Sequence, residues 1–304
     1  MRGLRAAFRP ARGAEPQQRH RRRVTWPLSI ALLLCLAGCA AAVVAPPAPP
    51  GTRTVTLHTP DGDRSAIVHR AASAAPGAPL VVVLHGARGT ARDMRAKLGW
   101  DALADRERLV VAYPDGLDHT WNAGRCCGSA RDRKVDDVGF LDELVATLRR
   151  DDGVGAVYAV GFSNGAMMSY AWACARPGAL AGIGPVAGAL TVDCPAPAPL
   201  TVVAVHGTRD ERVPFEGGRG PSGVDFRSFD ASLAPFRTAA ACPATGVQAV
   251  AAPARVDDRS CDGHAVVSDV VDGFTHVWPG AGPAAGTTTG PLDATGFLWA
   301  HLQG

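Results

Sequence analysis

Four short aliphatic runs constrain the fold of this 304-residue chain more than any other feature. They cover residues 80–84, 109–113, 157–160 and 200–205, and none alternates with polar residues. Runs of this kind are typical of strands buried on both faces of a parallel sheet. Helical segments are expected between them. The order predicts an α/β fold: a mostly parallel, doubly wound sheet with helices on both faces.

The helices and the two ends of the domain have signals of their own. Leu141, Leu144, Val145 and Leu148 repeat at helical spacing, with Asp136 or Asp137 placed to cap that helix. A second helix is expected over residues 164–176, before Pro177. We also predict an antiparallel hairpin from 53–57 and 65–69, a loop over 216–223, and a closing helix over 293–302.

The first 51 residues resemble an export leader followed by a spacer. An apolar run, 28–37, follows Arg21, Arg22 and Arg23 and is too short to span a bilayer, so residues 1–39 are typical of a signal peptide. The tetrad Leu36 to Cys39 resembles the lipobox of bacterial lipoproteins, with Cys39 as the lipid attachment site. A plain secretory signal with an incidental cysteine is the alternative. Residues 40–51, rich in Pro and Ala, would be a tether.

The net charge argues against a nucleic-acid partner. Eight arginines and one glutamate precede residue 24, so this segment contributes +7 to the formal charge of +3 and the remainder carries −4. A slightly acidic domain has no electrostatic footprint for nucleic acid.

Six cysteines follow residue 39, an even number that suits disulfides in an exported protein. We predict a Cys242–Cys261 bond, which would close a loop just before the segment of His276. A bond between neighbours closes a strained ring. We therefore expect Cys126 and Cys127 each to pair at a distance, with Cys174 and Cys194 as partners in an order that the sequence leaves open. Buried free thiols are the alternative.

Residues 161–165 read Gly-Phe-Ser-Asn-Gly, the GxSxG pentad, directly after the strand 157–160 and directly before a helix rich in Ala and Met. Strand, sharp turn and helix are what the nucleophile elbow of the α/β-hydrolase fold requires. The pattern predicts Ser163 as a nucleophile at the carboxyl edge of the sheet. A glycine turn without chemistry is the alternative.

In that fold the acid and the base follow the serine along the chain. His276 lies in a loop after the expected strand 265–271, whereas His264 opens that strand and His301 falls in the last helix. Asp210 follows the strand 200–205 and could orient the imidazole of His276, with the adjacent Glu211 as the alternative acid. We predict a Ser163, His276 and Asp210 triad.

Residues 85–90 follow the first buried strand and match the loop that supplies an oxyanion donor. Backbone N–H groups at Ala87 and Asn164 would hold the anionic intermediate. We expect His85 to shape this loop rather than to move protons, and we place His85, Trp121 and Trp278 as candidates at the substrate pocket. The chemistry needs neither metal nor cofactor, and we predict none.

Seven motifs between residues 79 and 280 together resemble one family. They are LVVVLHG (80–86), YPDG (113–116), WNAGRCCG (121–128), DDVGFL (136–141), GFSNGAMM (161–168), HGTRD (206–210) and HVWPG (276–280). The chain is similar to the secreted α/β-hydrolases that include poly(3-hydroxybutyrate) depolymerases, feruloyl esterases and acetylxylan esterases. The resemblance implies Ser163, Asp210 and His276 as triad and an α/β-hydrolase catalytic domain over residues 52–304.

Two departures from the family pattern bear on the substrate. Gly273, Phe274 and Thr275 stand where members have a glycine run, and Phe236 stands where members have a tryptophan.

The sequence therefore predicts a secreted serine carboxylic ester hydrolase acting through an acyl-enzyme. It would lie outside the cell or at its surface, held to the membrane only by a lipid anchor, with a polyester or a feruloylated or acetylated polysaccharide as substrate. A serine peptidase of the same fold and a non-catalytic binding lipoprotein are the alternatives.

Overall fold

A ten-stranded sheet forms the centre of the computed structural model, which describes residues 48–241, 247–248, 254–261, 264–282 and 292–303. These residues belong to one compact unit, Ala45–Gly304. From edge to edge the strands are β1 (Gly51–Thr59), β2 (Gly62–Arg70), β4 (Val110–Pro114), β3 (Leu80–Leu84), β5 (Val157–Phe162), β6 (Gly182–Val186), β7 (Thr201–Gly207), β12 (His264–Val271), β11 (Ala254–Cys261) and β10 (Val247–Gln248).

The middle of this sheet is parallel and its two ends are antiparallel. Neighbouring strands run parallel from β4 through β3, β5, β6 and β7 to β12. The β1–β2 hairpin pairs antiparallel with β4 at one end, and β11 and β10 pair antiparallel beyond β12 at the other. The predicted mostly parallel sheet and its opening hairpin are confirmed. All parallel strands therefore present their carboxyl ends at one edge.

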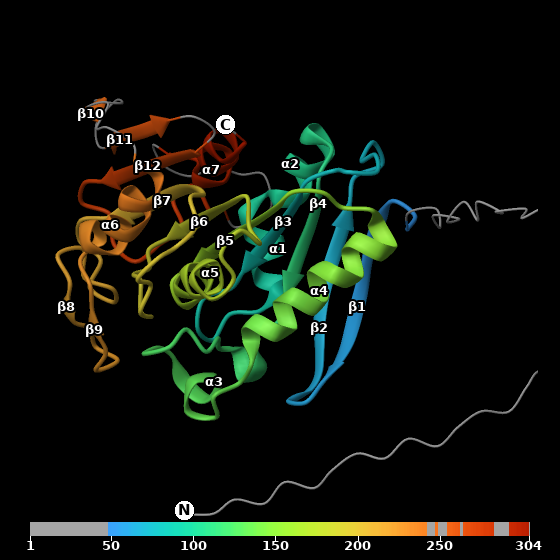
Figure 1. The fold of residues 1–304 in the computed structure, drawn as a ribbon, viewed down its shortest axis with the longest axis horizontal. Coiled ribbons are helices and arrows are strands. Elements are labelled where there is room, and N and C mark those ends of the chain that lie inside the picture. Colours follow the sequence, from blue (N-terminus) through green and yellow to red (C-terminus); the bar gives the residue numbers. More distant parts are fainter. Residues whose placement is uncertain (1–47, 242–246, 249–253, 262–263, 283–291, 304) are drawn as a thin grey trace, which may run out of the picture. The chain divides into compact units, whose positions relative to one another are not determined.

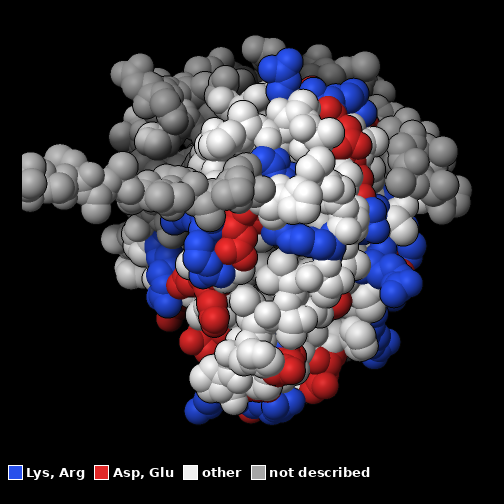
Figure 2. Space-filling model, turned by 90° about the vertical axis from the view of Figure 1, so that its right-hand side faces the viewer, with Lys and Arg blue, Asp and Glu red and all other residues white. Residues whose placement is uncertain are grey.

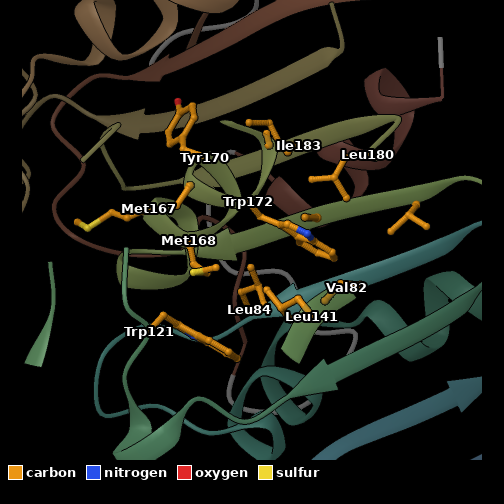
Figure 3. Close-up of a cluster of buried hydrophobic side chains, with 14 of the residues drawn as sticks. Val82, Leu84, Trp121, Leu141, Met167, Met168, Tyr170, Trp172, Leu180 and Ile183 are labelled. Atoms are coloured by element: carbon orange, nitrogen blue, oxygen red, sulfur yellow. The ribbon is translucent and has the colours of Figure 1, made fainter. Parts of the chain in front are cut away.

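Helices cover both faces of the sheet, as predicted (Figure 1). The apolar residues of α4 (Asp137–Asp152), α5 (Asn164–Ala175) and α6 (Phe229–Ala240) pack on one face, and those of α1 (Ala91–Leu98), α2 (Trp100–Glu107) and α7 (Ala294–Leu302) on the other. Side chains of a strand alternate between the two cores. Val82 and Leu84 of β3 lie beside Trp172 of α5 in the first core (Figure 3), and Val81 and Val83 belong to the second.

Helix ends follow the local sequence. Asp136 caps α4, since its carboxylate accepts a hydrogen bond from the N–H of Gly139 at 2.9 Å. α5 ends at Ala175, one residue before the predicted end and two before Pro177. α7 begins at Ala294, with Asp293 as N-cap residue.

Strand β6 has no aliphatic run, and the sequence did not predict it. Its sequence is Gly-Ile-Gly-Pro-Val. A Cβ on Gly182 would lie 2.9 Å from Leu302 of α7, and one on Gly184 would lie 2.8 Å from Val160 of β5. The glycines allow close packing between α7 and the sheet. Because glycine and proline replace β-branched residues in this strand, a prediction based on β-branched runs misses it.

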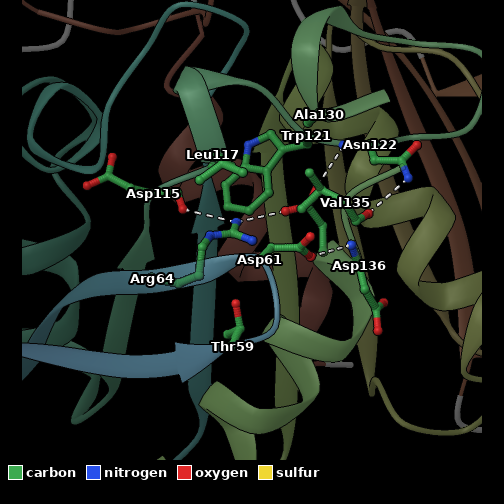
Figure 4. Close-up of polar contacts among 12 residues, drawn as sticks. Thr59, Asp61, Arg64, Asp115, Leu117, Trp121, Asn122, Ala130, Val135 and Asp136 are labelled. Carbon is green, nitrogen blue, oxygen red and sulfur yellow. Dashed lines mark hydrogen bonds and ion pairs between the residues drawn. The ribbon is translucent and has the colours of Figure 1, made fainter. Parts of the chain in front are cut away.

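A long connection between β4 and α4 carries the short helices η1 (Leu117–His119) and α3 (Gly128–Asp132). It is fastened to the β1–β2 hairpin by Arg64, whose guanidinium donates to Asp137 Oδ1 at 2.7 Å and to the carbonyl of Asp115 at 3.2 Å (Figure 4). The other oxygen of Asp137 accepts the N–H of Asn122 at 2.7 Å. Burial raises the pKa of Asp137, while Asn122 and Arg64 counteract part of that rise.

Residues 216–223, predicted as a loop, contain the two-residue strand β8 (Gly218–Arg219), which pairs with β9 (Asp225–Phe226). This β8–β9 hairpin and α3 extend from the same side of the sheet in Figure 1.

Basic and acidic side chains are interspersed over the face drawn in Figure 2. No helix within the described ranges combines the length and the apolar character that crossing a membrane requires. The predicted signal peptide, residues 1–39, and the tether up to residue 47 lie outside the described residues.

Candidate active site

Ser163 lies at the sharp turn between β5 and α5, with φ 55° and ψ −117°. Few non-glycine residues adopt such angles, and holding one there costs about 1–3 kcal/mol. The turn is fixed on both sides, because Ser163 N–H donates to Val186 of β6 at 2.9 Å and its carbonyl accepts the N–H of Met167 at 3.0 Å. The backbone therefore projects this side chain from the carboxyl edge of the sheet.

The two glycines of the pentad have no room for a side chain. A Cβ on Gly161 would stand 2.3 Å from the carbonyl oxygen of Gly165, and one on Gly165 would stand 2.2 Å from that of Leu84. Both obstacles are backbone atoms that cannot rotate away. The GxSxG spacing is thus a packing requirement of this turn.

Three predicted side chains form a continuous hydrogen-bonded series. His276 Nε2 lies 2.9 Å from Ser163 Oγ, and His276 Nδ1 lies 2.8 Å from Asp210 Oδ2. Glu211, the alternative acid, is exposed to solvent, whereas Asp210 is buried. The ring of His276 also rests against that of Phe162, with centroids 4.9 Å apart. The sequence therefore selected the side chains that the fold brings together.

Asp210 is surrounded by donors. Its Oδ1 accepts the N–H groups of Arg212 and Val213, both at 2.9 Å, and its Oδ2 lies 3.3 Å from His206 Nε2. Burial alone would raise the pKa of this carboxyl, but hydrogen bonds with His206, His276 and Val213 outweigh burial and hold the pKa well below its usual range. Asp210 is thus a fixed negative charge facing the imidazole.

The turn before His276 is tied to the loop that carries Asp210. Arg209 N–H donates to the carbonyl of Phe274 at 2.9 Å, and Gly273 N–H donates to Thr208 Oγ1 at 2.9 Å. These bonds hold His276 beside Asp210. Sequence reasoning missed this role, although Thr208 stands inside the HGTRD motif.

The two predicted oxyanion donors are backbone N–H groups without an acceptor in their own segments. Asn164 is the first residue of α5, so the helix offers no acceptor for its N–H. Within the described residues, Ala87 N–H has no hydrogen-bond acceptor either, and Ala87 borders the space in front of Ser163.

Trp121 connects these two donors. Its backbone is clamped by the Asn164 side chain, with Trp121 N–H donating to Oδ1 at 2.7 Å and Asn164 Nδ2 donating to the Trp121 carbonyl at 3.0 Å. Its indole N–H donates to the carbonyl of His85 at 2.9 Å, two residues before Ala87. One residue thereby fixes the elbow and the 85–90 loop relative to each other.

Two cavities adjoin at Phe162 and His276, and one of them borders Ser163. The main cavity, of about 650 Å³, is bordered by Ser163, His276, residues 86–88, Cys126–Cys127 and the β8–β9 hairpin. The second cavity, of about 490 Å³, shares residues 86–88, Phe162 and His276 and extends toward Trp278. A bound molecule could therefore extend from His276 into both spaces.

Two predicted pocket residues are not at the pocket. His85 and Trp121 are fully buried and border neither of these two cavities, so the structure does not place them at this pocket. Both ring nitrogens of His85 contact the backbone of neighbouring loops. Nδ1 lies 2.8 Å from the Gly86 carbonyl oxygen, and Nε2 accepts the N–H of Gly116 at 2.8 Å. Burial lowers the pKa of His85, which agrees with the shaping role expected for it. Trp278 does border the second cavity.

The disulfide prediction needs correction. Cys174 and Cys194 bond to each other with Cα atoms 5.4 Å apart, and Cys126 bonds to its neighbour Cys127. The expectation that Cys126 and Cys127 pair at a distance is wrong, because α5 and the segment before β7 bring Cys174 and Cys194 together. The predicted Cys242–Cys261 bond falls outside the residues whose side chains are described.

The segments between residues 65 and 235 match the family model of esterase PHB depolymerases, more than half of the chain. The chain belongs to this family of esterases. Phe236, one of the two expected departures, is buried against Tyr170 with ring centroids 5.6 Å apart, and it borders neither cavity.

Several named relatives support this assignment. The chain is 31% identical to "Putative esterase NocK" of Nocardia uniformis subsp. tsuyamanensis, over 83% of this chain and 89% of that protein. It is 31% identical to feruloyl esterase C of Emericella nidulans, over 40% and 42% of the two chains. It is 28% identical to poly(3-hydroxyalkanoate) depolymerase C of Paucimonas lemoignei, over 45% and 34%. The match thus spans most of NocK but less than half of the other two.

Solved structures agree on the fold. An acetyl xylan esterase from Aspergillus awamori superposes with a TM-score of 0.55 at 13% identity, over 74% of this chain and 94% of that chain. The native structure of sOPH superposes with a TM-score of 0.53 at 17% identity, over 77% and 83%. Likenesses at this identity show the α/β-hydrolase fold alone.

Proposed function

We propose that this esterase hydrolyses carboxylic esters through an acyl-enzyme formed on Ser163. The observation that carries the proposal is the unbroken series Ser163 Oγ, His276 and Asp210 Oδ2, with contacts of 2.9 and 2.8 Å. It opens into a cavity at the carboxyl edge of the sheet. This arrangement is what general-base activation of a serine needs.

In the first half-reaction Ser163 Oγ attacks the ester carbonyl while His276 Nε2 takes the hydroxyl proton. Asp210 stabilises the imidazolium that forms, and the N–H groups of Ala87 and Asn164 hold the oxyanion. The C–O bond to the alcohol then breaks, and His276 gives its proton to the departing oxygen. In the second half-reaction His276 deprotonates a water, which attacks the acyl carbonyl and releases the carboxylic acid and Ser163.

The substrate belongs to the ester classes named for the relatives: feruloyl esters, acetylxylan or poly(3-hydroxyalkanoates). Apolar side chains of Met167, Val213 and Phe226 line the main cavity and would contact the carbon chain or ring of such a substrate.

We also propose export and lipid attachment at Cys39, followed by the tether and the catalytic domain 52–304. The Cys174–Cys194 bond supports an oxidising location. Replacing Cys39 by Ser should move the protein from the membrane fraction to the medium. A wild type already wholly soluble outside the cell would contradict lipid attachment.

The function is tested by turnover on matched panels of 4-nitrophenyl esters and peptide anilides. The wild type should hydrolyse esters and leave the anilides intact, and Ser163→Ala should lose at least about 10³-fold in kcat while unfolding at the same temperature. Preference for anilides would favour the peptidase alternative. Absence of turnover on both panels would favour a binding lipoprotein.

A further inference from the structure

The main cavity carries an unusual charge distribution. Among the described residues that border it, Arg88 and Arg212 are charged side chains, and no aspartate or glutamate joins them. Elsewhere in the described part of the chain, exposed arginines such as Arg133, Arg150 and Arg176 contact carboxylates of neighbouring residues. Among the described residues, the main cavity thus has cationic side chains without a carboxylate at its border, whereas the second cavity, which Arg88 also borders, carries both Asp93 and Lys97.

Neither guanidinium has a partner among the residues that the structure describes. No hydrogen bond, ion pair or ring contact is found for the side chain of Arg88 or Arg212 among the described residues, and both residues are exposed. Arginine placed at a cavity without a carboxylate partner retains its full capacity for a bidentate contact with an anion.

The backbone fixes both residues at the catalytic groups. Arg88 has φ 68°, a left-handed conformation that a non-glycine residue rarely adopts, and its N–H donates to the carbonyl of His119 at 2.8 Å. It directly follows Ala87. Arg212 uses its own N–H to bind Asp210 Oδ1 at 2.9 Å. The loop that carries the oxyanion donor Ala87 therefore also carries Arg88, and the loop that carries Asp210 also carries Arg212.

From this geometry we propose that Arg88 and Arg212 select esters that carry a free carboxylate away from the scissile bond. This inference rests on the proposed ester hydrolysis and names its substrate class. The apolar wall contacts the carbon skeleton, while the guanidinium groups bind the carboxylate. Two sources supply this chemistry: the carboxyl end of a short hydroxy-acid oligomer, and a uronic acid unit of an acylated polysaccharide.

The test compares charged and neutral members of two substrate pairs. One pair is the linear dimer of 3-hydroxybutanoate and the same dimer capped as its primary amide. The other is mono-O-acetylglucuronic acid and mono-O-acetylglucose. Release of 3-hydroxybutanoate or acetate gives kcat/KM for each. We expect the charged member of one pair to be favoured by about tenfold or more, as a charge-assisted contact implies. The pair that shows the preference identifies the source.

Substitution locates the effect. The double variant Arg88→Gln, Arg212→Gln should bring the charged-to-neutral ratio of kcat/KM close to one, whereas Arg133→Gln, which removes an arginine outside the cavity, should keep the ratio of the wild type. Raising the ionic strength should also lower the ratio in the wild type. Turnover of 4-nitrophenyl acetate by the double variant reports whether the triad is intact.

Two results would overturn the inference: a wild-type ratio near one for both pairs, or a preference that survives in the double variant. In either case turnover of the neutral esters keeps the proposed function standing. If the wild type turns over neither these substrates nor 4-nitrophenyl acetate, the proposed function fails and the inference fails with it.

Discussion

The elbow around Ser163 and the rim of the main cavity lie at the same edge of the sheet but are built differently. At the elbow, backbone atoms pack directly against backbone atoms of neighbouring segments. Gly165 has no space for a Cβ, and backbone hydrogen bonds hold Ser163 between β6 and α5. At the rim, Arg88, Arg212 and Ser222 are exposed side chains on loops. The elbow admits one sequence pattern, whereas the rim admits many.

This difference separates chemistry from selectivity. Groups that move protons or hold an oxyanion must stay within a few tenths of an ångström of their working positions, so hydrogen bonds between backbone segments fix the elbow and the loops that carry them. Groups that choose a substrate need only border the cavity, so loops can carry them. Substitutions at the elbow and its supports should therefore cost much more than comparable ones at the rim.

The largest effect is expected at the acid. Asp210→Asn removes the negative charge that faces His276 and allows the imidazole to adopt the wrong tautomer, so kcat should fall by roughly 10²- to 10⁴-fold. Glu211→Gln, the matched change at the exposed neighbour, should leave kcat within about twofold of the wild type. Steady-state kinetics on 4-nitrophenyl acetate measures both. Similar losses in the two variants would break the distinction between buried support and exposed neighbour.

The next effect compares alanine at two glycines. Gly165→Ala places a Cβ 2.2 Å from the Leu84 carbonyl oxygen, and the displacement of β3 or α5 should lower the free energy of unfolding by more than about 3 kcal/mol. Gly223→Ala, next to Ser222 of the rim, places a Cβ 3.7 Å from the Arg219 side chain at φ 76° and should cost only about 1 kcal/mol. Urea denaturation of both variants and the wild type measures these changes in the free energy of unfolding. Equal costs would show that the elbow is no tighter than the rim.

A smaller effect is expected where the two oxyanion donors are joined. Trp121→Phe keeps a ring in the core but removes the indole N–H that binds the His85 carbonyl, so the 85–90 loop should move relative to Asn164. We expect kcat to fall about tenfold with KM nearly unchanged, since a misplaced oxyanion donor affects the transition state. A rise in KM at constant kcat would assign Trp121 to substrate binding instead.

The smallest effect concerns a second buried carboxyl, on the strand beside Asp210. Asp269 of β12 is 1% exposed and neither carboxylate oxygen has a partner among the described residues. Burial raises its pKa to about 6, although the charge of His301 counteracts part of this rise. A raised folded-state pKa means that its contribution to stability is present below about pH 4 and is lost as the pH rises through about 6.

Replacing Asp269 by Asn should therefore flatten the pH dependence of stability between pH 4.5 and 8, by roughly 1 kcal/mol across that range. Urea denaturation at several pH values measures the slope. If the free energy of unfolding depends on pH equally in the wild type and in Asp269→Asn, then Asp269 does not titrate with a raised pKa. The contrast with the well-hydrogen-bonded Asp210 would then fail.

The sequence predicted the parts that depend on local pattern. The aliphatic runs identify β3, β4, β5 and β7, and the order of Ser163, Asp210 and His276 follows from positions at strand ends. Strand β6 was missed because its glycines serve contacts with α7 and β5 rather than strand propensity.

Features that depend on how the long connection between β4 and α4 folds could not be predicted from the sequence. The WNAGRCCG motif gives no sign that Trp121 points into the core or that Cys126 and Cys127 bond to each other, because both depend on how residues 115–137 fold over α5. Arg88 and Arg212 carried no signal at all, since an exposed arginine is ordinary until its surroundings are known.

The central claim is that Ser163 becomes acylated, and one measurement tests it directly. Mixing the wild type with an excess of a slowly hydrolysed 4-nitrophenyl carbamate should release one equivalent of 4-nitrophenol per protein in a burst. The intact mass should rise by one carbamoyl group, and peptide mapping should place that group on Ser163. Modification of any other residue, or a burst that persists in Ser163→Ala, would contradict the account.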